Sequence, residues 1–80
     1  MAKSMELCVK AQDGTRLHFK IRPYIKLRKL LIRYCERKQL EFETVKFLYN
    51  GQRVSTRHTA QKLKMKNGDE IDAMLPCMGA

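Results

Sequence analysis

The sequence lacks the features that would place it outside the class of small globular proteins. Its 80 residues include only 2 prolines and 4 glycines, so neither a low-complexity segment nor a repeat is indicated. The longest apolar run, Leu30 to Ile32, is far too short to cross a bilayer, and no apolar stretch of signal-peptide type begins the chain. We therefore expect one compact intracellular domain that does not enter a membrane.

Residues that could carry catalysis or bind a metal are sparse. The three cysteines, Cys8, Cys35 and Cys77, form no CxxC pair, which is typical of a reducing compartment. The two histidines lie far apart in the sequence, so neither a zinc site nor another cofactor is predicted. Asp69, Glu70 and Asp72 flank a predicted strand and are most simply solvated turn residues. We predict that the chain is not an enzyme.

Acidic residues are also few, and the excess of basic ones is the most unusual global feature. The chain has 17 Lys and Arg against 8 Asp and Glu, a formal net charge of +9. A charge of this size attracts acidic proteins, nucleic acid or anionic lipid, although it also fits an ordinary soluble surface. Nucleic-acid binding is the weaker hypothesis, because the helix cations have no aromatic stacking surface beside them.

The first twenty residues predict a β-hairpin. From Met5 to Ala11, and again from Thr15 to Ile21, apolar and polar side chains alternate with the period of a strand that buries one face. The turn between them contains Gly14, which can take a positive φ. Pro23 ends the second strand because it has no N–H to donate.

A helix is predicted from Leu27 to Lys38. Apolar residues recur there at helical spacing and form one stripe: Leu27, Leu30, Leu31, Tyr34 and Cys35. The other face is almost entirely basic, and no Ser, Thr, Asp or Asn precedes Leu27 to cap the first turn. We expect this weakly capped helix to pack on the hairpin.

The second half of the chain predicts three more strands. One covers residues 45–49 and ends at the Asn50-Gly51 turn, and a short one pairs back at Arg53 and Val54. Residues 60–65 then form one short helical turn, and residues 71–75 form the last strand. The order ββαββ(short helix)β is an α+β arrangement in which one main helix covers a mixed sheet, the β-grasp topology.

Several strings in the sequence carry a specific resemblance: Gln12-Asp13-Gly14, Phe19-Lys20-Ile21, Lys29-Leu30, Tyr34-Cys35-Glu36-Arg37, Asn50-Gly51-Gln52 and Gly68-Asp69-Glu70-Ile71-Asp72. Together they resemble the SUMO family of ubiquitin-like proteins, from Met5 to Ala80. The resemblance implies a flexible leader at residues 1–4, a domain at residues 5–75 and a tail at residues 76–80. It also implies a protein tag that is attached through its C-terminus to target lysines, in the nucleus and cytoplasm.

The tail departs from the pattern of the family. Members of the family end in Gly-Gly, whereas this sequence has Gly79 and Ala80 at the matching positions, preceded by Pro76 and Met78. An added methyl group would crowd the adenylation and thioester sites of the enzymes that join the tail to a lysine. The sequence leaves open both a covalent modifier and a SUMO-like recognition domain that acts without conjugation.

The resemblance also implies a peptide-binding groove between the second strand and the helix. SUMO proteins bind short aliphatic motifs there as an added strand. An apolar floor is expected from Leu17, Phe19, Ile21, Leu30 and Tyr34. Backbone pairing or a basic rim that attracts acidic or phosphorylated flanks is expected from His18, Lys20, Arg22, Lys29, Arg33 and Arg37. Without the resemblance, the apolar members of this set are simply core residues.

A second surface is implied for the conjugating enzyme, formed by Asp13, Gly14, Gly51 and Asp69. Lys64 and Lys66 reverse the local charge that the family usually has there, which should weaken docking on a basic enzyme. The expected partners are the SUMO activating and conjugating enzymes, SUMO proteases and proteins with SUMO-interacting motifs. The chain itself is expected to be a monomer.

Overall fold

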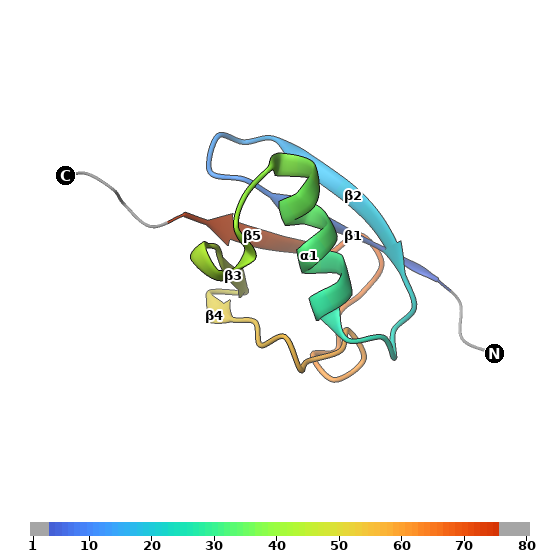
Figure 1. Ribbon diagram of the computed structural model, residues 1–80. Helices are drawn as coiled ribbons and strands as arrows, with labels where there is room; N and C mark the ends of the chain where they lie inside the picture. Colours follow the sequence, from blue (N-terminus) through green and yellow to red (C-terminus); the bar gives the residue numbers. More distant parts are fainter. Residues whose placement is uncertain (1–3, 76–80) are drawn as a thin grey trace.

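One helix packed on a mixed sheet makes up the fold. The computed structural model describes residues 4–75. The elements are β1 (Met5–Lys10), β2 (Arg16–Ile21), α1 (Leu27–Lys38), a 3-10 helix (Phe42–Thr44), β3 (Lys46–Tyr49), β4 (Gln52–Arg53) and β5 (Glu70–Met74). The sheet order is β2-β1-β5-β3-β4, and only the central pair β1 and β5 is parallel. Figure 1 shows α1 crossing one face of this sheet, so the predicted β-grasp arrangement is confirmed.

The hairpin forms because its alternating apolar residues share one buried face. Leu7 pairs with Phe19 and Val9 with Leu17 across the two antiparallel strands. The strand β2 starts at Arg16 rather than at Thr15, because the backbone N–H and the hydroxyl of Thr15 both donate to Asp13 Oδ1, at 2.9 and 2.7 Å. This local bonding of Asp13 holds the turn and delays the ladder.

The helix α1 has the predicted bounds and buries the predicted stripe. No side chain caps its N-terminus: Lys26 occupies the cap position, and the free N–H of Leu27 is instead satisfied by the carbonyl of His58, at 2.8 Å. The stripe packs on β1, β2 and β5, and the edge of the Tyr34 ring meets the Phe47 ring with centroids 6.0 Å apart. These contacts fix the position of α1 over the sheet.

A substitution at the C-terminus of α1 is expected to stabilise the fold. Gln39 adopts a left-handed conformation, φ 57°, and its N–H donates to the carbonyl of Glu36 while that of Leu40 donates to Cys35. Gln39→Gly is expected to raise the free energy of unfolding by about 1 kcal/mol, since glycine takes this conformation without the penalty that a Cβ brings. Lys38→Gly, one residue inside the helix, is the matched control and should lower it by about 1 kcal/mol. Urea unfolding measures both, and a less stable Gln39→Gly variant would contradict the prediction.

The remaining segments follow the predicted order, but several bounds differ, and β4 is Gln52–Arg53 rather than Arg53 and Val54. A short 3-10 helix at Phe42–Thr44, which the periodicity did not indicate, precedes β3, and β3 and β5 each begin one residue away from the predicted start. Residues 60–65, predicted as a short helical turn, are not a helix in the structure but a hydrogen-bonded turn, in which the Lys64 N–H donates to the carbonyl of Gln61, at 3.1 Å, and the Met65 N–H to that of Ala60, at 2.9 Å. Lys64 ends that turn with φ 56°. Ala60 and Met65 are buried and close the end of the core beneath it.

Several predictions concern residues that the structure does not describe. The leader predicted for residues 1–4, apart from Ser4, and the tail predicted for residues 76–80 lie outside the described range. Within the described range, no helix has the length and hydropathy to cross a membrane.

Candidate functional site

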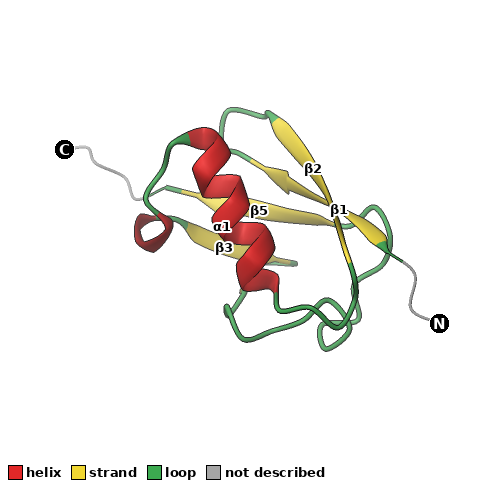
Figure 2. Cartoon of the chain, turned by 45° about the vertical axis from the view of Figure 1, so that its right-hand side comes forward, coloured by secondary structure: helices red, strands yellow, loops and turns green. Residues whose placement is uncertain are grey.

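The strand β2 is the outer strand of the sheet. Its only partner in the described part of the chain is β1, so one edge of its backbone has no strand beside it. The chain turns at residues 23–25 after β2, and α1 then runs back across one face of the sheet (Figure 2). An unpaired edge offers N–H and C=O groups to which an extended peptide can bind.

An open groove of ≈ 600 Å³ lies between β2 and α1. Phe19 and Ile21 from the strand and Leu30 from the helix, each exposed by less than a tenth, are the buried apolar residues of its lining. The complete lining is Ser4, Phe19, Lys20, Ile21, Arg22, Tyr24, Ile25, Lys29, Leu30, Ile32, Arg33 and Glu36. The groove therefore combines an apolar floor with the free edge of a strand.

Seven of the eleven residues predicted for the groove line it in the structure, and the other four are not among its lining residues: Leu17, His18, Tyr34 and Arg37. Tyr34 lines a second hollow, of ≈ 310 Å³, near the turn between β1 and β2. The guanidinium of Arg37 lies 5.8 Å from the centre of the Phe19 ring, in a cation–π contact. The open part of the groove is therefore shifted toward the N-terminal half of α1.

The shift adds lining residues that the sequence analysis missed, chiefly Tyr24, Ile25 and Ile32. Tyr24 and Ile25 lie in the connection between β2 and α1, where no periodicity exists to mark a face. Ile32 is off the core stripe, but it continues a second helical row with Lys29, Arg33 and Glu36, at spacings of three and four residues. That row is the one signal that could have revealed this side of the groove.

The rim of the groove is strongly basic. Lys20, Arg22, Lys29 and Arg33 are exposed and line it, and Glu36 is the only acidic residue among the lining side chains. The only ion pair found within residues 4–75, between Arg16 and Glu70, does not involve these cations. Their charge is therefore available to an acidic ligand.

The surface predicted for the conjugating enzyme divides into two parts. Gly51 and Asp69 lie near the start of β5, where the Tyr49 hydroxyl donates to Asp69 Oδ2 at 2.6 Å. Asp13 and Gly14 lie in the turn that approaches the other end of β5, where the backbone N–H of Leu75 donates to the side-chain oxygen of Gln12. The length of β5 separates the two parts, so the four residues do not form one compact cluster.

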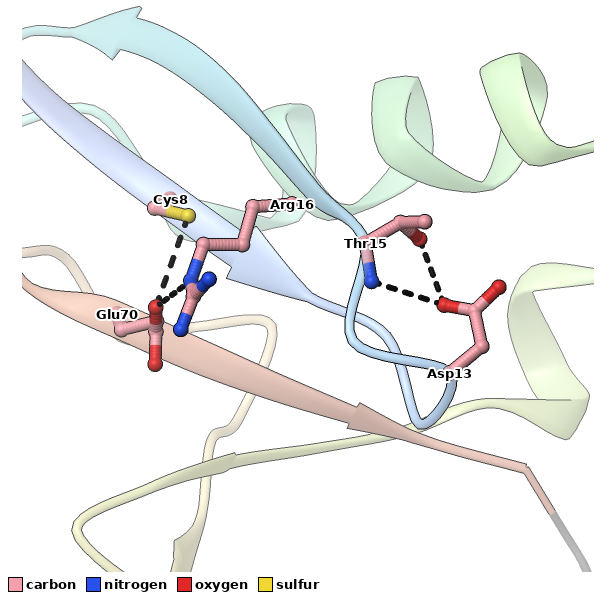
Figure 3. A network of polar contacts seen from close by, with 5 residues as sticks. All are labelled: Cys8, Asp13, Thr15, Arg16 and Glu70. Atoms are coloured by element: carbon pink, nitrogen blue, oxygen red, sulfur yellow. Dashed lines mark hydrogen bonds and ion pairs between the residues drawn. The ribbon is translucent and has the colours of Figure 1, made fainter.

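Figure 3 shows the polar contacts beside this surface. Arg16 Nε donates to Glu70 Oε2 at 2.5 Å, and this bond lowers the pKa of Glu70. The Cys8 thiol contacts the same carboxylate, at 3.9 Å, and burial raises its pKa. Cys8 is therefore held as a neutral thiol, which is the opposite of an activated nucleophile.

The pKa of Asp69 leads to a prediction of how the stability of the fold depends on pH. The hydrogen bonds from the Tyr49 hydroxyl and the Lys66 N–H lower the pKa of Asp69. A carboxyl group whose pKa is lower in the folded state than in the unfolded state stabilises the fold when it is ionised. This stability is fully present above the pKa of the unfolded state, about 4, and is lost as the pH falls through the pKa of the folded state. Tyr49→Phe should raise the pKa of Asp69, measured from its carboxyl carbon shift by NMR, and should reduce the loss of stability below about pH 4. An unchanged pKa would show that the Tyr49 bond is not formed in solution.

Comparisons with known proteins agree with this fold. The family model described as "Ubiquitin-2 like Rad60 SUMO-like" matches residues 5–75. Small ubiquitin-related modifier 2 of Arabidopsis thaliana is 42% identical over 71 residues, which are 89% of this chain and 69% of that protein. Small ubiquitin-related modifier 3 of the same plant is 40% identical over 67 residues, which are 84% of this chain and 60% of that protein.

A solved structure supports the fold independently. The structure described as Caldiarchaeum Subterraneum Ubiquitin superimposes with a TM-score of 0.86, at 19% identity, and covers 98% of this chain and 100% of that chain. The fold is therefore the ubiquitin-like β-grasp fold. The family match and the identity to the two plant proteins show further that the chain belongs to the SUMO family. On this relationship it is a small ubiquitin-like modifier and not an enzyme.

Proposed function

We propose that this chain acts by being bound, through the groove between β2 and α1, by SUMO-interacting motifs in other proteins. The observation that carries this proposal is the free edge of β2 beside an apolar groove with a basic rim. An extended peptide adds its backbone to β2 and places alternate aliphatic side chains over Phe19, Ile21 and Leu30. Asp, Glu or phosphoserine residues next to the aliphatic ones meet the cations of the rim.

The experiment is an NMR titration of the chain with a peptide that has a short aliphatic run flanked by acidic residues. The amide signals of Phe19, Ile21 and Leu30 are expected to shift, whereas those of Gly51 and Met65, which do not line the groove, should stay in place. A peptide of the same composition in scrambled order is the matched control, because it keeps the charge and loses the aliphatic run. An unchanged spectrum with the first peptide would reject the proposal.

We also propose that the chain is joined through its C-terminus to target lysines by SUMO activating and conjugating enzymes and released by SUMO proteases. Membership of the SUMO family supports this proposal, and Gly79 and Ala80 lie outside the described residues. Incubation with a SUMO activating enzyme and ATP should give an adduct that a thiol reductant cleaves. The variant Ala80→Gly is the matched comparison, since it places a glycine where members of the family have one.

The outcomes of that assay separate two functions. An adduct with the natural sequence supports a covalent modifier. An adduct with Ala80→Gly alone, together with peptide binding in the groove, would identify a recognition domain that is not conjugated. Nuclear and cytoplasmic localisation is part of the same proposal, and imaging of a fluorescent fusion would test it.

The exposed cations favour one further candidate function, the binding of nucleic acid. Arg28, Lys29, Arg33 and Arg37 all project from α1 and are exposed. Electrostatic binding to DNA would weaken steeply as the salt concentration rises. Binding that is absent, or that does not change with salt, would remove this candidate.

A further inference from the structure

The groove does not stop where β2 stops. The strand ends at Ile21, but the lining continues through Tyr24 and Ile25 in the connection to the helix and through Ile32 on α1. Tyr24 is 52% exposed, the largest exposed fraction among the large apolar and aromatic side chains of the described residues. Together with the half-buried Ile25 and Ile32, this tyrosine forms an apolar surface that no helix or strand of the described residues covers.

The two ends of the groove differ in what occupies them. At the Phe19 end, the Arg37 guanidinium lies 5.8 Å from the centre of the aromatic ring. At the Tyr24 end, the Arg22 guanidinium donates to the tyrosine hydroxyl at 3.3 Å, and both residues line the groove. The end of the groove that leads past Ile21 is therefore lined by an exposed aromatic side chain, and we call it the open end.

A bound peptide cannot continue its backbone hydrogen bonds to β2 at this open end. Pro23 has no N–H, so a ladder between a bound peptide and β2 is interrupted at this residue. A peptide that continues beyond Arg22 can therefore gain only side-chain contacts there. We refer to Tyr24, Ile25 and Ile32 as the terminal subsite.

We propose that the peptide partner of this chain has a further bulky apolar or aromatic residue, beyond those that pair with β2, which binds in the terminal subsite. This inference rests on the proposed function of the groove. In an extended peptide, side chains on one face recur about every 6.8 Å, so the added residue lies two positions beyond the last one that contacts Ile21. The partner is therefore an acidic peptide with a longer apolar run than the β2 edge alone would accommodate.

The charges around the subsite decide between an acidic peptide and a second copy of this chain. Arg22, Lys29 and Arg33 line the groove on both sides of the subsite and are exposed. A second copy has a net charge of +9 and would bring further cations against them. An acidic peptide instead neutralises this rim, which is why it is the occupant that the groove favours.

The test uses three synthetic peptides and the full chain. The first has a short aliphatic run flanked by aspartates, and the others add one leucine two positions before or two positions after that run. One of the two extended peptides is expected to bind the natural chain about five- to tenfold more tightly than the first, because its leucine side chain is removed from water when it packs against the terminal subsite. Calorimetry or fluorescence anisotropy measures the dissociation constants.

Two variants locate the gain in affinity. Tyr24→Ala and Ile32→Ala should each remove most of the gain from the extended peptide, so that the extended peptide and the first peptide bind each variant about equally well. Met74→Ala, which removes an exposed apolar residue of β5 that does not line the groove, is the matched control and should keep the gain. Both substituted residues of the subsite are at least partly exposed, so the variants are expected to fold, which circular dichroism checks.

The outcomes distinguish failure of this inference from failure of the proposed function. If the first peptide binds and neither extended peptide binds more tightly, the terminal subsite is rejected while the groove stands. The same conclusion follows if the gain survives in both Tyr24→Ala and Ile32→Ala. If none of the peptides binds the natural chain, the groove and its extension are both rejected.

Discussion

Replacing Leu31 by alanine is expected to lower the free energy of unfolding by about 3 kcal/mol. The Leu31 side chain is 0% exposed and packs in the core between α1 and the sheet, so the shortened side chain leaves a cavity there. Domains of this size are marginally stable, and a loss of about 3 kcal/mol is a large fraction of the usual 5–15 kcal/mol. Urea unfolding followed by circular dichroism measures the change.

The neighbouring Ile32→Ala variant is the matched control for this prediction. Ile32 lies on the groove side of α1 and is only partly buried, so its truncation should cost about 1 kcal/mol or less. Equal losses for the two variants would mean that α1 does not present Leu31 to the core in the way described. The comparison therefore tests the rotation of the helix that positions the whole groove.

Reversing the charge of the helix side of the groove, with Lys29→Glu and Arg33→Glu together, is expected to weaken the binding of an acidic-aliphatic peptide about tenfold at low salt. Both side chains line the groove and are exposed, so the substitution replaces attraction of the acidic flank by repulsion. The difference from the natural chain should shrink as salt is added, because exposed charges are screened. Titrations at two salt concentrations measure the effect.

The matched control reverses the charge of one arginine and one lysine that lie outside the groove. Arg57→Glu with Lys62→Glu gives the same net charge, but neither residue lines the groove. This variant should bind the peptide within about twofold of the natural chain, since its charges act only over a long, screened distance. An equal loss in both double variants would show that overall charge, and not the rim of the groove, attracts the peptide.

The fold could be predicted because each main element has a strong periodic signal. The hairpin alternates with period two, and α1 begins and ends at the predicted residues. The local bonds that set the remaining boundaries give no such signal. The side chain of Asp13 delays β2, and Gln39 ends α1 in a conformation that the sequence alone would sooner assign to glycine.

The site was predicted less completely than the fold. The strand residues Phe19 and Ile21 could be placed from their alternation and from the family resemblance, but Tyr34 is drawn into the core by its contact with Phe47. Tyr24 and Ile25 lie in an irregular connection whose path depends on how the helix docks. Such residues are set by tertiary packing, which periodicity does not encode.

The free edge of β2 also bears on how the protein behaves at high concentration. If two copies met edge to edge, Arg16, His18 and Lys20 of one strand would face the same side chains of the other, and Lys20, unlike Arg16, has no ion pair within residues 4–75, so like charges would be brought together. This repulsion opposes the stacking of exposed edges that begins aggregation. Polyanions or concentrated salt would remove it, and these are the conditions in which we expect purified material to lose solubility first.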